Sequence, residues 1–227
     1  MSPCGYNRNM TDIIRLHDAD YMPIILRCKE ALDAGELVIL PTDTVYGLAA
    51  RADLPGAVRT IFEAKGRDAE KALVVMVPSA EEAAELAADE ERETLLRLGG
   101  LWPGPLTLVV RAGEVPWRES VAPSTIMLGI RVPDSPLLLS LLDISGPLAM
   151  TSANLSGGTA PVSFDKIESA LVAKARIAVD GGYRGSGRPS TVAELRKGGL
   201  KVLRSGEIDP GELRKALLQD GENNKIP

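Results

Sequence analysis

The sequence predicts an α/β protein whose twisted, mixed sheet is flanked by helices. Short apolar runs of buried-strand length alternate along the chain with segments whose apolar residues recur at helical spacing. Strands interleaved with helices in this way are typical of a sheet covered by helices. No composition break, long Pro/Gly linker or internal repeat divides the 227 residues. We therefore expect one main domain over residues 13–208, a loose tail over 1–12, and a C-terminal helix and tail over 209–227.

The first half of the chain carries alternating helix and strand signals. Gly35 ends the first helical stripe, and Pro41 closes the wholly apolar run that follows it. Ser79 and Glu82 fit a capping box, which marks the start of a later helix. In chain order we expect a helix over 24–32, a strand over 37–40, a helix over 55–65, a strand over 73–77 and a helical region over 79–99.

The second half continues the alternation with shorter elements. Pro136 favours a helix start, because proline suits the first helical position, and Pro210 does the same near the C-terminus. The stiff turn Trp102–Pro105 is interpreted as a packing corner. In chain order we expect strands over 106–110 and 128–132, a helix over 136–143, a strand over 148–151, a helix over 165–173, strands over 177–179, 191–195 and 201–203, and a helix from 209 to 218.

Composition excludes several classes of function. The formal net charge of −5 argues against a broad basic nucleic-acid surface, and no apolar run is long enough to span a membrane. The N-terminus has no signal-peptide pattern, so we expect the cytoplasm. Cys4 and Cys28 do not form a disulfide or zinc pattern, and His17 is the only histidine. A histidine metal cluster is therefore excluded, and chemistry should depend on positioning and electrostatics.

Two short polar clusters are the strongest functional signal in the chain. Lys65-Gly66-Arg67 supplies two cations and Ser152-Ala153-Asn154 supplies a hydroxyl and an amide, each pair at positions i and i+2. In an extended segment this spacing points both side chains to one face. If the fold brings the clusters together, they form a socket for a phosphate chain. Taken separately, each cluster is more simply explained as an ordinary solvated loop.

Further polar residues lie where apolar strands begin or end. Thr42 to Thr44 follow one predicted strand, Ser190 precedes another, and Arg204 follows a third. In α/β sheets, ligands gather at strand ends because loops there expose polar atoms over a rigid base. Arg131 lies inside an apolar strand and requires an anionic partner, which either an acidic side chain or a ligand would supply. The sequence contains neither the G-x-G-x-x-G nor the G-x-x-x-x-G-K-[ST] phosphate motif.

Seven collinear segments together resemble the YrdC-like family of threonylcarbamoyl-AMP synthases. The resemblance extends over roughly residues 15–206, and the seven segments in order are far more specific than any one of them. It implies the YrdC-like fold with a large polar cavity lined by positive charge. Because the sequence ends at residue 227, we expect a single-domain member without the extra C-terminal domain of longer ones. The segments are 41–48, 65–67, 102–107, 131–133, 152–157, 190–192 and 203–206.

The resemblance also implies a reaction and a set of partners. The expected enzyme is a nucleotidyltransferase that makes threonylcarbamoyl-AMP and pyrophosphate from L-threonine, bicarbonate or CO2, and ATP with Mg2+, for a tRNA modification. Proteins of the later tRNA step would be partners, whereas binding to tRNA itself is weakly supported. The resemblance implies ATP-binding roles for Lys65, Arg67, Lys71, Ser152, Asn154 and Arg204, catalytic roles for Lys65 and Arg67, and threonine-binding roles for Thr44, Arg131 and Ser190. It implies no metal ligand among the side chains.

Some positions depart from the pattern of the family and keep two other readings open. Lys71 replaces an asparagine that helps to bind ATP, and Met76 stands where a threonine-binding histidine is common. The segment that begins at Asp134, directly after Arg131-Val132-Pro133, also departs from the family pattern. These changes favour a YciO-like paralogue with a nucleotide cavity and weak or different activity. A non-enzymatic RNA-binding module is the third reading, which the negative charge and the 4% aromatic content oppose.

Overall fold

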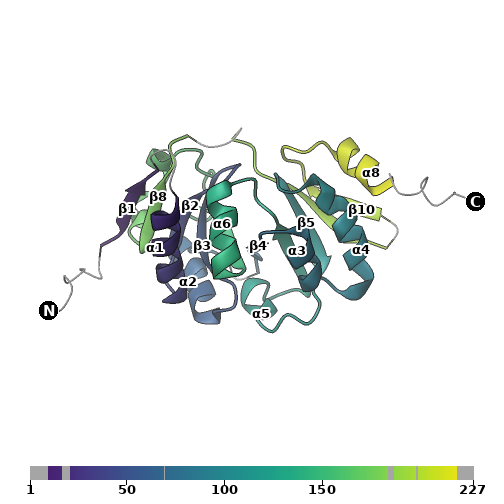
Figure 1. The fold of residues 1–227 in the computed structure, drawn as a ribbon, viewed down its shortest axis with the longest axis horizontal. Coiled ribbons are helices and arrows are strands. Elements are labelled where there is room, and N and C mark those ends of the chain that lie inside the picture. The colour runs from purple at the N-terminus through teal and green to yellow at the C-terminus, as the bar shows by residue number, and fades with distance from the viewer. Residues whose placement is uncertain (1–9, 17–20, 69, 184–186, 198, 219–227) are drawn as a thin grey trace, which may run out of the picture.

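The computed structural model describes residues 10–16, 21–68, 70–183, 187–197 and 199–218. Cys4, His17, most of the predicted N-terminal tail and the tail after residue 218 lie outside these ranges. The described strands form one ten-stranded mixed sheet in the order β1-β8-β2-β3-β7-β4-β6-β5-β9-β10 (Figure 1). The strands are β1 (Asp12–Arg15), β2 (Val38–Pro41), β3 (Tyr46–Arg51), β4 (Val74–Met76), β5 (Leu106–Arg111), β6 (Met127–Arg131), β7 (Leu148–Ser152), β8 (Ile177–Asp180), β9 (Thr191–Arg196) and β10 (Gly199–Arg204).

The helices gather in two groups. Figure 1 shows α1, α2 and α6 toward one end of the sheet and α3, α4 and α8 toward the other, with β4 visible between them. Within the described ranges, no helix is long and apolar enough to cross a bilayer. The helices are α1 (Met22–Asp33), α2 (Pro55–Lys65), α3 (Ala80–Leu86), α4 (Asp89–Leu98), α5 (Arg118–Val121), α6 (Pro136–Ser145), α7 (Ser169–Val172) and α8 (Pro210–Leu218), with 3-10 turns at Gly99–Leu101 and Phe164–Lys166.

The sheet combines parallel and antiparallel pairs, which confirms the predicted mixed class. β3 pairs antiparallel with both β2 and β7, whereas β4 pairs parallel with β6. This register places Gly47 opposite Ser152 and Met76 opposite Arg131. Segments that are far apart in the sequence therefore meet at the centre of the sheet.

Apolar side chains form two buried clusters. The larger one includes side chains of α2, α3 and α4 packed on strands at the centre of the sheet, and the smaller one lies around α1 and α6. Val75 belongs to the larger cluster and its neighbour Met76 to the smaller one, because successive strand residues point to opposite faces. Leu213 of α8 is buried in the larger cluster, so the last predicted helix packs onto the domain.

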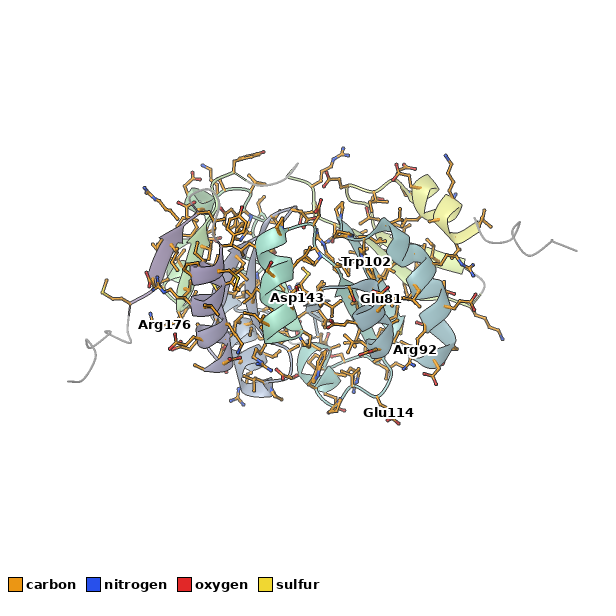
Figure 2. All side chains as sticks on the ribbon, in the orientation of Figure 1. Glu81, Arg92, Trp102, Glu114, Asp143 and Arg176 are labelled. Atoms are coloured by element: carbon orange, nitrogen blue, oxygen red, sulfur yellow. The ribbon has the colours of Figure 1, made fainter. Side chains whose placement is uncertain are left out.

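Trp102 and Pro103 confirm the predicted packing corner. The Trp102 side chain is 9% exposed, and its indole Nε1 donates to the carbonyl of Leu106 at 2.8 Å. The Trp102–Pro103 peptide bond is cis. Figure 2 shows Trp102 near the helices α3 and α4. The corner thus connects the α4 region to the start of β5.

Several elements differ from the sequence-based expectation. The strands β1 and β3 and the short helix α5 were not predicted. The helical region over 79–99 is two helices, because Ala87 is extended and pairs with Ala112 in a β-bridge. The predicted helix over 165–173 is a 3-10 turn followed by the single turn α7. The two predicted helical segments are thus interrupted, the first by a tertiary contact and the second by a short break between Lys166 and Ser169.

Candidate functional site

Lys65 joins the two polar clusters in space. It is the last residue of α2, and Gly66 follows it in the left-handed conformation with φ 57°, which glycine adopts without strain. The Lys65 ammonium group donates hydrogen bonds to the main-chain carbonyls of Ser152 and Asn154. The amide of Ser156 donates to the Lys65 carbonyl at 3.0 Å. The predicted meeting of residues 65–67 and 152–154 is confirmed.

The loop after β7 is held in shape by its own side chains and by β3. The amide of Ala153 donates to the carbonyl of Tyr46 at 2.8 Å. The Asn154 side-chain amide donates to the carbonyls of Leu155 and Gly158, both at 2.8 Å, and its oxygen accepts from the Ser152 hydroxyl. Asn154 therefore organises the loop, and the Ser152 hydroxyl is what this pair presents to the cavity.

A cavity of about 460 Å³ opens over the central strands next to these clusters. Its apolar floor includes Met76, Met127 and Met150. Six of the residues predicted to bind ligands line this cavity: Thr44, Arg67, Arg131, Ser152, Ser190 and Arg204.

The other three predicted residues have different positions. Lys65 and Asn154 are buried behind the wall of the cavity, and neither is among its lining residues in the described chain. Lys71 is exposed, and its main-chain carbonyl accepts from Arg67 Nε at 2.9 Å. The structure thus gives the Lys71 backbone a role in placing Arg67, while a contact of its side chain with ATP stays a prediction.

Arg131 is buried at the centre of the site. Its side chain is 4% exposed, and its Nη2 donates to Asp43 Oδ2 at 2.6 Å. Its Nη1 donates to Thr44 Oγ1 at 3.1 Å and its Nε to the carbonyl of Gly104 at 3.0 Å. Burial lowers the pKa of Arg131, and Asp43 opposes this shift. Arg131 therefore has the acidic partner that its position required, and it also lines the cavity.

Arg67 is oriented by the loop that follows it. Its Nε donates to the carbonyl of Lys71 and its Nη2 to the carbonyl of Ala72, both at 2.9 Å. Neither bond uses Nη1, so the guanidinium retains donors for a ligand. Burial lowers the pKa of Arg67.

Ser190, Arg204 and Thr107 form a third polar group on the cavity wall. Arg204 Nη2 donates to the carbonyl of Ser190 at 3.0 Å and to its hydroxyl at 3.1 Å. The Ser190 hydroxyl lies 2.9 Å from Thr107 Oγ1, and both side chains are buried. The sequence analysis missed Thr107 and Asp43. A threonine within the apolar strand 106–110 and an acid between two threonines after Pro41 were the signals that would have found them.

Among the residues that the structure describes, the charged side chains that line the cavity are all cations, and together they favour an anionic ligand. They are Arg67, Arg131 and Arg204, and the buried Lys65 is bonded to the carbonyl of the lining residue Ser152. Burial, followed by the charge of Arg67, lowers the pKa of Lys65 to about 8, and Glu168 opposes the shift. Burial and the charge of Arg131 lower the pKa of Arg204. Shifts of this kind concentrate at functional sites, and a bound polyanion would relieve the repulsion that contributes to them.

The comparison with known families agrees with this site. The family model Sua5_yciO_yrdC, described as telomere recombination, matches residues 30–206. The chain belongs to the Sua5/YciO/YrdC family. The matched stretch contains every residue that the sequence analysis predicted for the site. The matched stretch begins inside α1 and leaves out β1, so it does not test the predicted domain limits of 13 and 208, which stay predictions.

Relatives within the Sua5/YciO/YrdC family share about a third of the sequence. A threonylcarbamoyl-AMP synthase of Pyrococcus abyssi is 36% identical over 81% of this chain and 54% of its own length. One of Bacillus subtilis is 34% identical over 96% of this chain and 65% of its own length. The crystal structure of P. abyssi Sua5 complexed with L-threonine has a TM-score of 0.80 at 34% identity and covers 91% of this chain and 60% of that one. The chain thus spans between half and two thirds of the length of these relatives.

Proposed function

We propose that the chain is an L-threonylcarbamoyladenylate synthase, a nucleotidyltransferase that uses L-threonine, bicarbonate or CO2, and ATP. The observation that carries this proposal is the junction of the two polar clusters through Lys65 beside a cavity that also contains Arg131. Relatives that are named threonylcarbamoyl-AMP synthases support it. In this proposal the product supplies the threonylcarbamoyl group for a tRNA modification.

The polyphosphate would lie on the side of the cavity formed by Arg67 and Ser152. Arg67 offers donors that its loop contacts do not use, and Ser152 presents a hydroxyl at the end of β7. Lys65 would add positive charge from behind Arg67 and Ser152. Its two carbonyl contacts leave one N–H group of its ammonium unused, which could be directed to the phosphate chain. Arg204 would also contact the nucleotide. Asn154 contributes by fixing the loop that carries Ser152.

The amino acid would lie beside Arg131. Nη1 and Nη2 of Arg131 each retain an N–H group after their contacts with Thr44 and Asp43, so the guanidinium can receive a carboxylate. The hydroxyls of Thr44 and Ser190 face the same cavity. Thr107 positions the Ser190 hydroxyl through their 2.9 Å contact.

The proposed reaction needs charge neutralisation more than a strong base. The threonine amine adds to CO2 and loses a proton, which gives a carbamate. A carbamate oxygen then attacks the α-phosphorus of ATP, and the bond to the bridging oxygen breaks as pyrophosphate leaves. Cations placed in advance stabilise the charge that develops on the leaving group. Arg67 and Lys65 would do this for the pyrophosphate oxygens.

ATP would enter as its magnesium complex. The described residues contain no cluster of three or more His, Cys, Asp or Glu side chains that could hold a metal ion. Magnesium often keeps several waters and binds through phosphates with few protein ligands, so this surrounding fits an ion carried by the nucleotide. The magnesium ion would add to the neutralisation of the phosphate charge.

Pyrophosphate release tests the proposal directly. The chain is incubated with ATP, Mg2+ and bicarbonate, together with threonine, serine or no amino acid. Release that requires threonine supports the synthase, and mass spectrometry should then find the threonylcarbamoyl adenylate. Release that ignores the amino acid would instead identify a nucleotide hydrolase.

One observation favours a second candidate, a YciO-like paralogue that binds a nucleotide. Met76 occupies the cavity floor opposite Arg131, and it packs in the same apolar cluster as Met150. A methionine there offers no strong hydrogen bond to a threonine hydroxyl. Tight nucleotide binding without pyrophosphate release under any of the three conditions would support this candidate. Partner proteins and contacts with tRNA remain predictions.

A further inference from the structure

Asp43 and Arg131 form a buried ion pair in which half of the carboxylate has no partner. Their side chains are 13% and 4% exposed, and Asp43 Oδ2 accepts from Arg131 Nη2 at 2.6 Å. Asp43 Oδ1 is shielded from solvent and has no hydrogen-bond partner among the residues that the structure describes. A buried carboxylate oxygen without a donor is costly, and such an atom in a folded protein calls for an explanation. A donor that arrives with a ligand would satisfy it.

The turn around Asp43 is rigid. The hydroxyl of Thr42 donates to the carbonyl of Val45 at 2.7 Å and accepts from the amides of Thr44 and Val45 at 3.1 and 3.2 Å. The Thr42 amide donates to the Val45 carbonyl at 3.2 Å. This network fixes the turn that carries Asp43, and the contact with Arg131 holds the Asp43 carboxylate through Oδ2. The position of the orphaned Oδ1 is therefore largely set before any ligand binds.

Asp43 borders a smaller cavity that shares the lining residue Thr42 with the main one. The smaller cavity has a volume of about 190 Å³. Arg131 lies on the main cavity and contacts Asp43 directly. A ligand group on the free N–H groups of Arg131 is therefore next to the Asp43 carboxylate.

We propose that Asp43 receives the α-ammonium group of the amino-acid substrate while Arg131 receives its α-carboxylate. This inference rests on the proposed function and adds a residue to its amino-acid site. In the described part of the chain, the charged side chains that line the main cavity are the cations Arg67, Arg131 and Arg204, so an ammonium group finds its counter-charge at Asp43.

The charge balance of the pair explains why it suits a zwitterion. A simple carboxylate on Arg131 would share the cation with Asp43 and leave two anions side by side in a buried site, which is unfavourable. An α-amino acid brings its own positive charge, which pairs with the orphaned Oδ1. The buried pair therefore selects amino acids against carboxylic acids of the same shape. A carboxylic acid without the ammonium group would leave the Asp43 charge unpaired, and an unpaired charge disfavours binding of that ligand.

Calorimetric binding to the full chain tests this role. L-Threonine is compared with 3-hydroxybutanoate, which keeps the carboxylate and the hydroxyl but lacks the amine. We expect the wild-type chain to prefer threonine by at least about tenfold, as for a charge-assisted hydrogen bond. In Asp43→Asn, threonine affinity should fall by at least about tenfold, while the affinity for 3-hydroxybutanoate should stay equal or rise.

The control variant is Asp134→Asn. Asp134 is an exposed carboxylate that also borders the smaller cavity and has no ion pair with Arg131. Its removal should leave threonine affinity within about twofold. ATP affinity and the thermal unfolding midpoint report whether each variant is folded.

The outcomes separate this inference from the proposed function. If Asp43→Asn binds threonine as the wild type does, or if the wild type binds both compounds equally, the role of Asp43 is refuted and the synthase proposal stands. If the wild type binds alanine or serine through Asp43 but not threonine, Asp43 is supported and the threonine synthase is refuted. If the wild type binds no α-amino acid, both are refuted. The comparison of the two ligands on the wild type needs no variant, so equal binding refutes the role of Asp43 even if Asp43→Asn fails to fold.

Discussion

The ammonium group of Lys65 is hydrogen-bonded to the main-chain carbonyl of Ser152, across 87 residues of sequence. One buried side chain therefore links the C-terminus of α2 to the loop that follows β7. The same cation lies behind the wall of the main cavity, so we expect both stability and ligand binding to depend on this one group. Five predictions separate these effects from those of the surrounding residues.

Replacement of Lys65 by Met should destabilise the fold. Lys65 is 3% exposed, and its loss removes the Lys65 donor from the Asn154 carbonyl and one donor from the Ser152 carbonyl, which also accepts from the Asn154 amide. Unsatisfied buried groups cost about 1–3 kcal/mol, so the free energy of unfolding should fall by that order. Denaturant titration measures the change. Lys71→Ala is the control, because its exposed side chain should alter stability by less than about 0.5 kcal/mol.

Arg67→Ala should fold and lose catalysis. The side chain lines the cavity, and removal of one preorganised cation costs about 3 kcal/mol of transition-state stabilisation by analogy with a lost oxyanion donor. We expect threonine-dependent pyrophosphate release to fall at least tenfold, by about 1.4 kcal/mol or more. Arg59→Ala, which removes an exposed cation of α2 outside the residues that line the cavity, should retain most of this activity. Near-normal turnover in Arg67→Ala would remove Arg67 from the mechanism.

The affinity for ATP should weaken as the pH rises through about 8. The pKa of Lys65 in the folded chain is lowered from 10.5 to about 8, so the cation is present below this pH and lost above it. Binding of a polyanion near pH 8 should therefore take up protons, which calorimetry in buffers of different ionisation enthalpy detects. Lys65→Met should lose this pH dependence. An ATP affinity that is flat between pH 7 and pH 9 in the wild type would contradict the assignment.

The lowered pKa of Lys65 also affects the free energy of unfolding, which should rise with pH where the affinity for ATP falls. Between pH 8 and 10.5 the unfolded chain holds a proton on Lys65 that the folded chain has released. The unfolded state then binds more protons, so the contribution of Lys65 to the free energy of unfolding rises with pH in this window. The difference between wild type and Lys65→Met, measured at pH 7.5 and pH 10, isolates this contribution.

Thr107→Val should impair use of the amino acid without unfolding the chain. The change keeps the shape of the side chain but removes the hydroxyl that lies 2.9 Å from Ser190 Oγ. Loss of a neutral hydrogen bond costs about 0.5–1.5 kcal/mol, so we expect KM for threonine to rise about two- to tenfold. Thr60→Val is the matched control, because its hydroxyl donates to Ala57 on α2, away from the main cavity. An equal effect in both variants would show that Thr107 acts only through stability.

Local patterns in the sequence predicted most of the strands and the end of α2. The segments at 106–110 and 191–195 became β5 and β9 almost residue for residue. The first is apolar apart from Thr107, as a buried strand requires, and the second alternates buried and half-buried side chains, as a strand with one buried face does. β3 was missed because its residues follow the polar turn 42–44 and include glycine and alanine, which carry little strand signal. The Glu-rich region over 79–99 carried helical periodicity throughout, and only the pairing of Ala87 with Ala112 breaks it.

The sequence by itself determined which side chains were available for chemistry: a pair of cations, a hydroxyl and amide pair, and a charge inside an apolar strand. Only the tertiary structure decided that Lys65 and Asn154 lie behind the cavity wall, that Asp43 neutralises Arg131, and that Lys71 is exposed. The reason is that strand and helix signals arise within a few residues, whereas the position of a side chain in a site depends on strand order and register. Asp43 and Arg131 are 88 residues apart, and nothing in either segment encodes the other.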